Sequence, residues 1–67
     1  MTGNKELGNK LRLLRGERTM QEVADAIGVS LQAISMYENG RRRPSDEVKE
    51  RIAKFYGASV ERLFYAN

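Results

Sequence analysis

The chain has 67 residues, of which 12 are lysine or arginine and 9 aspartate or glutamate, so its net charge is +3 and its pI is near 9.6. It contains no cysteine and no histidine. This excludes disulfides and Cys-based metal sites, and it removes the side chain most often used for acid–base catalysis. We expect one small domain over residues 1–67, without a cofactor or a metal, whose stability comes from helix packing.

Two further classes of protein are disfavoured by what the sequence lacks. It has no pair of carboxylates at catalytic spacing and no glycine-rich phosphate loop, so we do not expect an enzyme. The first ten residues, MTGNKELGNK, are polar and charged, unlike a signal peptide. No stretch approaches the roughly 18 apolar residues of a membrane span. We therefore expect a cytoplasmic protein that does not bind membranes.

Two helices are predicted in the first half of the chain. Leu7, Leu11 and Leu14 recur at helical spacing and predict a helix over residues 5–17. Thr19 is a good N-cap residue, and Glu22 three positions later completes a capping box, so a second helix is expected to begin at residue 20.

The second and third predicted helices meet at a tight turn, residues 27–30. Gly28 fits the left-handed position that ends one helix, and Ser30 fits the N-cap of the next, over residues 31–39. Ile34 and Tyr37 are expected to face inward, and Gly40 follows the end of this helix. The spacing is typical of a helix-turn-helix whose second helix enters the major groove of DNA.

The last third of the chain predicts two more helices. Pro44 and Ser45 open a fourth, which Gly57 ends, and Ser59 begins a short fifth. Apolar residues follow helical spacing throughout, and no useful strand pattern occurs. The expected fold is therefore all-α, with five helices.

A basic segment lies directly after the third predicted helix, in addition to the charge of +3 carried by residues 1–18. Arg41, Arg42 and Arg43 give residues 31–43 a net charge of +2, whereas residues 44–67 are neutral. A basic segment at this place is what contact with DNA phosphates requires.

These residues resemble the Cro/phage-repressor helix-turn-helix family, also called the XRE family. The resemblance is carried by residues at fixed spacing, namely Thr19, Glu22, Val23, Ala24, Ile27, Gly28, Val29, Ser30, Ile34, Ser35, Tyr37, Glu38, Asn39 and Gly40, followed by Arg-Arg-Arg-Pro-Ser and by a tail over residues 52–64. It covers about residues 7–65. It implies a compact lambda-repressor-like domain, often a dimeric transcriptional repressor of bacteria, phages or mobile elements. It also implies an internal ion pair between Arg15 and Glu38, for which two solvated charges are the alternative.

Two features depart from the family pattern. The first position of the second helix, commonly a glutamine that touches a phosphate, is Met20 here, with Gln21 beside it. The connection between the first two helices is about two residues shorter than in many members.

Four residues share the expected outward face of the third helix. Gln32 is the strongest candidate for reading a base, because its amide can bond to adenine N6 and N7. Leu31 and Met36 would contact thymine methyl groups, or else fill gaps in the core or form a dimer contact. Ser35 completes this set of predicted base contacts.

A second set of residues is expected to contact DNA phosphates. Backbone N–H groups, amides and guanidinium groups suit that role, and Ala33 is small enough to allow a close approach. Ser30 serves first as a cap. The predicted phosphate contacts are Gln21, Ser30, Ala33, Asn39, Gly40, Arg41, Arg42 and Arg43.

The apolar tail has two interpretations. Val60, Leu63, Phe64 and Tyr65 either cover the core or form a homodimer contact, which would match a palindromic operator. The sequence thus predicts a regulator of double-stranded DNA, most simply a dimeric repressor. The alternative is an antitoxin-like module that holds a partner protein and regulates its own gene by binding DNA.

Overall fold

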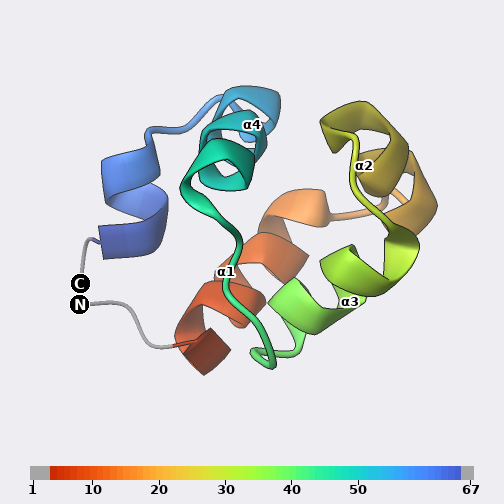
Figure 1. The fold of residues 1–67 in the computed structure, drawn as a ribbon, viewed down its shortest axis with the longest axis horizontal. Helices are drawn as coiled ribbons and strands as arrows, with labels where there is room; N and C mark the ends of the chain where they lie inside the picture. The colour runs from red at the N-terminus through yellow and green to blue at the C-terminus, as the bar shows by residue number, and fades with distance from the viewer. Residues whose placement is uncertain (1–3, 66–67) are drawn as a thin grey trace.

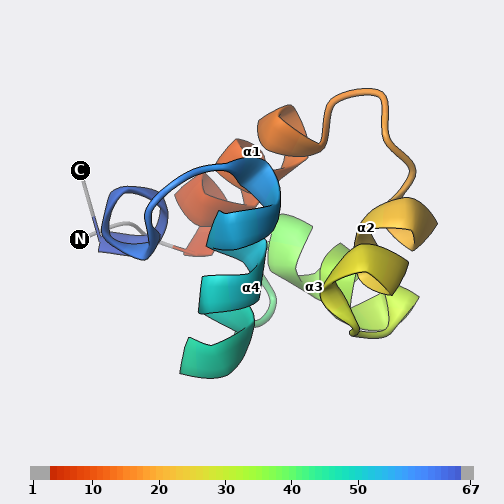
Figure 2. The same cartoon turned by 90° about the horizontal axis from the view of Figure 1, so that it is seen from above.

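The computed structural model describes residues 4–65, and every regular element in that part of the chain is helical. The elements are α1 (Asn4–Arg15), α2 (Met20–Ile27), α3 (Leu31–Glu38), α4 (Asp46–Tyr56) and the short π-helical turn η1 (Glu61–Tyr65) (Figure 1). Helices α2 and α3 lie toward one end of the molecule and η1 toward the other, with α1 and α4 between them (Figure 2). The predicted all-α, five-helix fold is confirmed.

The local signals that delimit α2 and α3 act as the sequence predicts. The Thr19 hydroxyl accepts a hydrogen bond from the backbone N–H of Glu22 at 3.0 Å, and Gly28 ends α2 at φ 83°. The Ser30 hydroxyl accepts from the backbone N–H of Ala33 at 3.1 Å and caps α3. The turn that carries α3 relative to α2 is therefore fixed by one glycine and two caps.

The predicted helices at residues 5–17 and after Ser59 differ most from the structure, and α3 ends one residue earlier than expected, at Glu38. Helix α1 ends at Arg15 rather than at Glu17, because Gly16 adopts φ 58° and turns the chain out of the helix. The fifth element is a π-helical turn, η1, rather than an α-helix, although the Ser59 hydroxyl accepts from the backbone N–H of Arg62 as a cap would. A five-residue element is held by its buried side chains more than by its own backbone bonds.

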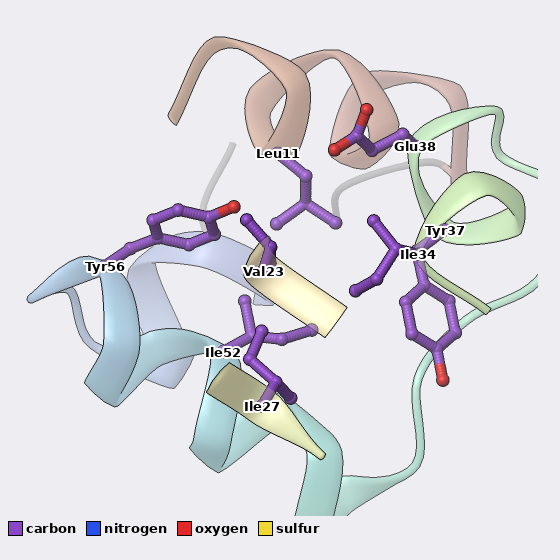
Figure 3. Close-up of a pocket in the computed structure, with 8 residues that line it drawn as sticks. All are labelled: Leu11, Val23, Ile27, Ile34, Tyr37, Glu38, Ile52 and Tyr56. Atoms are coloured by element: carbon purple, nitrogen blue, oxygen red, sulfur yellow. The ribbon is translucent and has the colours of Figure 1, made fainter. Parts of the chain in front are cut away.

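The core draws on all five elements. Its largest fully buried side chains are those of Phe64, Leu7, Ile52 and Val23. A small cavity of about 10 Å³ remains beside Val23 and Ile52, with room for one water molecule at most. Figure 3 shows the isoleucine side chains of α2, α3 and α4 pointing toward one another around it, with Tyr56 on its far side. This space is a packing defect of the core, too small for a ligand.

Helices α1 and α3 approach closely at Gly8, a residue that is buried. A Cβ atom at Gly8 would lie only 2.2 Å from the backbone oxygen of Glu38. Only glycine lets the two backbones come so near. This crossing sets the position of α3 against the rest of the molecule.

Candidate nucleic-acid interface

The outward face of α3 presents a mixed polar and apolar surface. Ile34 and Tyr37 are buried, as the sequence predicts, which turns Leu31 and Gln32 to the solvent. Leu31 is 44% exposed and Ser35 and Met36 are half-buried. All four residues named as base contacts are thus accessible, with Leu31 and Gln32 the most prominent.

The side-chain amide of Gln32 is available to form hydrogen bonds with a ligand. It lies one position into α3, and its amide has no hydrogen-bond partner within residues 4–65. Gln21, by contrast, donates from Nε2 to the Asp25 carboxylate at 2.8 Å. Met20 packs against the core instead of lying free at the start of α2. The two glutamines therefore differ: the Gln32 amide makes no hydrogen bond within residues 4–65, whereas Gln21 uses one of its two amide protons on Asp25.

Ala33 lies in the core, with 8% of its surface exposed. Its side chain packs inward, so any contribution of Ala33 to a close approach of the sugar-phosphate backbone comes from its small size. Ser30 is exposed, and its hydroxyl serves as the cap of α3. Its O–H proton remains available to donate to a phosphate oxygen.

Asn39 joins α3 to α1. Its Oδ1 accepts a hydrogen bond from Nη2 of Arg12 at 3.2 Å, while its Nδ2 donates to the Ser35 hydroxyl at 3.3 Å. One amide proton remains for a phosphate. The predicted contact residue is therefore held in place from both sides.

The segment after α3 exposes two arginines. Gly40 has φ 73°, and a Cβ atom there would lie 3.1 Å from the backbone of Asn4, so the loop lies against the start of α1. Arg43 is half-buried and donates to the Asn4 side chain at 3.3 Å. Arg41 and Arg42 are exposed. Two guanidinium groups are thus presented next to the end of α3.

Arg15 and Glu38 form a bidentate ion pair between α1 and the last residue of α3. Arg15 Nε lies 2.7 Å from Glu38 Oε2, and Nη2 lies 3.1 Å from Oε1. The Glu38 side chain is only 2% exposed. Its hydrogen bond raises the pKa of Arg15, and burial, with Glu38 nearby, raises the pKa of Tyr56. The pair fixes the end of α3 to α1, which makes its role structural.

The apolar tail divides into buried and exposed residues. Phe64 is fully buried and Leu63 is 6% exposed, so both cover the core of a single chain. For these two residues the burial favours the first interpretation, in which the tail covers the core. Val60 is half-buried and Tyr65 is 48% exposed. These two remain as candidates for a contact between copies.

Two classes of site are missing from residues 4–65. No group of three or more acidic side chains there could hold a metal ion. No helix there is long and apolar enough to cross a membrane.

The geometry of α2, α3 and the turn between them defines a helix-turn-helix domain, and comparison with known proteins agrees. Residues 6–63 match the family of helix-turn-helix domains, to which the chain belongs. It is similar to the cryptic phage CTXphi transcriptional repressor RstR of Vibrio cholerae, with 42% identity over 57 residues, or 82% of this chain and 51% of that protein. It is also similar to the HTH-type transcriptional regulator MJ0272 of Methanocaldococcus jannaschii, with 38% identity over 58 residues, 84% of this chain and 88% of that protein.

The two relatives differ in length. The chain spans about half of the Vibrio repressor but most of the Methanocaldococcus regulator. The family resemblance inferred from the motif is confirmed at the level of the helix-turn-helix family.

Proposed function

We propose that this protein binds double-stranded DNA sequence-specifically and regulates transcription by placing α3 in the major groove. One observation carries the proposal. An exposed α3 face with a free glutamine amide lies directly beside two exposed arginines, Arg41 and Arg42. The first feature suits the reading of base edges, and the second suits phosphates on either side of the groove.

Both relatives support a regulatory role, since both are transcriptional regulators by name and one is a repressor. We propose that this protein is also a repressor, and that it acts by occupying a promoter. A domain that buries one helix in the groove is large enough to exclude a polymerase from the same segment of DNA.

We further propose that two copies bind a palindromic operator. A two-fold protein matches two half-sites spaced about 34 Å apart along the duplex. Tyr65 in η1 and Val60 just before it are the accessible apolar residues of the tail that would form the contact. Light scattering with and without a selected duplex measures the number of protein copies in the complex. A complex of one protein per duplex at saturation would contradict this part of the proposal.

The burial of the tail bears on the antitoxin-like alternative. That hypothesis used the apolar tail as a docking surface for a partner protein, yet Leu63 and Phe64 lie inside the core. DNA binding alone is therefore the better-supported function.

The phosphate role of the arginines is tested by the salt dependence of binding to duplexes selected from a random pool. Each phosphate contact that releases a counterion contributes about 0.9 to the slope of log K against log salt. We expect Arg42→Ala to weaken selected and random duplexes equally and to reduce the slope by about one contact. A slope near zero for the unchanged protein would refute the phosphate role.

Base reading by Gln32 is tested with the same duplexes. Gln32→Ala should cost about 1–3 kcal/mol on the selected sequence and relax the preference at one base pair, with little effect on random DNA. Gln21→Ala serves for comparison, because loss of its predicted phosphate contact would weaken selected and random duplexes equally. Equal weakening of selected and random duplexes by Gln32→Ala would show that Gln32 reads no base.

A further inference from the structure

Helix α1 carries a polar stripe that the helix-turn-helix motif does not include. Lys5, Asn9 and Arg12 follow one another at i, i+4 and i+7, so they share one face of α1. With Glu38 and Asn39 of the α3 end they line an open groove. We call these five residues the α1 groove.

The free charge of the α1 groove is positive. Its one carboxylate, that of Glu38, is held by Nε and Nη2 of Arg15 and is almost completely buried. Lys5 is exposed and has no hydrogen-bond or ion-pair partner within residues 4–65. Arg12 is also exposed, and its only bond there uses Nη2, which leaves its other donors available. An ammonium and a guanidinium group therefore face the solvent together.

The α1 groove is continuous with the arginine segment after α3. Gly40 lies against the backbone of Asn4 and Lys5, where its Cβ would be at 3.1 Å, and Arg43 bonds to Asn4. Figure 1 shows this loop passing beside the first turn of α1. Basic residues that are far apart in the sequence thus form one surface.

A chain of hydrogen bonds also links the α1 groove to the reading face. Arg12 donates to Asn39, and Asn39 donates to the Ser35 hydroxyl on the outward side of α3. The guanidinium group is therefore held at a fixed position relative to the helix that would enter the major groove. A cation placed this way suits the phosphate backbone that borders the groove.

We propose that the α1 groove binds a backbone phosphate of the same duplex through Lys5 and Arg12, and that it extends the DNA contact beyond the helix-turn-helix. The inference rests on the proposed DNA-binding function. The contact carries no sequence information, because a phosphate is the same beside every base pair.

The test compares two lysines of equal charge. We expect Lys5→Gln to reduce the slope of log K against log salt by about 0.9, which is one phosphate, on selected and random duplexes alike. Arg12→Gln should lower it by a similar amount. Lys54→Gln, an exposed lysine near the end of α4 without a partner within residues 4–65, should leave the slope unchanged. Thermal unfolding of each variant shows that it is folded.

Ethylation interference on the selected duplex locates the contact. The unchanged protein should be sensitive to ethylation at a phosphate that Lys5→Gln no longer senses and that Arg42→Ala still senses. If Lys5→Gln and Lys54→Gln have the same slope while Arg42→Ala lowers it, the α1 groove binds no phosphate although the protein binds DNA. If the unchanged protein shows no salt-dependent binding, the proposed function itself fails.

Discussion

The ion pair between Arg15 and Glu38 shows how one buried charge is satisfied in a core with few polar groups. Both carboxylate oxygens of Glu38 accept from the guanidinium group, and Arg15 also donates to the backbone oxygen of Arg18 at 2.8 Å. No buried side-chain nitrogen or oxygen within residues 4–65 lacks a hydrogen-bond partner. A charge left without its partner in such a place is strongly destabilising.

Glu38→Gln is therefore expected to lower the free energy of unfolding by about 3 kcal/mol, since it removes the charge that compensates Arg15. The lower end of the usual range applies because the Arg15 side chain is 17% exposed. Urea unfolding measures the loss. In an Arg15→Met background the same substitution should cost much less, and an equal cost in both backgrounds would show that the pair contributes nothing.

The sequence predicts the role of a single residue well where that role depends only on the local backbone. Thr19, Gly28 and Ser30 are recognisable because caps and left-handed turns select a few residue types. It does not reveal the bridge from Arg12 through Asn39 to Ser35, because those partners are 27 and 4 residues apart and depend on how α1 crosses α3. A polar residue at a helix end has many possible hydrogen-bond partners, and the sequence pattern does not indicate which of them it will bond.

The contact between α1 and α3 sets the position and direction of α3 in the molecule. Gly8 has no role in the apolar stripe of α1, and the sequence pattern assigns it none. The structure places it where the backbone of α3 passes, so that a side chain has no room. A glycine inside an otherwise helical pattern is the available signal for such a close approach.

Gly8→Ala sets two effects against each other. Alanine improves helix propensity by about 0.5–1 kcal/mol, but a Cβ atom 2.2 Å from the Glu38 backbone oxygen forces the helices apart. Overpacking of this kind costs about 1–3 kcal/mol, so we expect a net loss of stability. Affinity for the selected duplex should also fall, because displacement of Glu38, the last residue of α3, changes the position of the whole helix.

Gly57→Ala is the control for that substitution. Gly57 has φ 68°, and no atom lies within 4 Å of the place that a Cβ atom would take, so alanine there costs about 1 kcal/mol through backbone strain alone. DNA affinity of the folded protein should be unchanged. A Gly8→Ala protein as stable as the unchanged one would mean that α1 and α3 can separate freely.

At the scale of the whole molecule, η1 packs against both α4 and α1. Lys49, only 8% exposed, donates from Nζ to the Tyr65 hydroxyl at 2.7 Å, and Nζ also lies 5.7 Å from the centre of the Phe64 ring. These contacts hold η1 to α4, while η1 also packs against α1. The sequence predicts a buried lysine poorly, because burial depends on a tyrosine 16 residues away.

Phe64→Ala is expected to unfold most of the protein. Removing a fully buried phenylalanine costs about 3–5 kcal/mol, which is about as much as a domain of this size has in total. Phe64→Leu removes fewer atoms and should cost about 1–2 kcal/mol, leaving a folded protein that still binds DNA. Far-ultraviolet circular dichroism with urea distinguishes these outcomes. If Phe64→Ala kept the helical signal and the unfolding midpoint of the unchanged protein, η1 would be an attachment to the helix-turn-helix rather than part of its core.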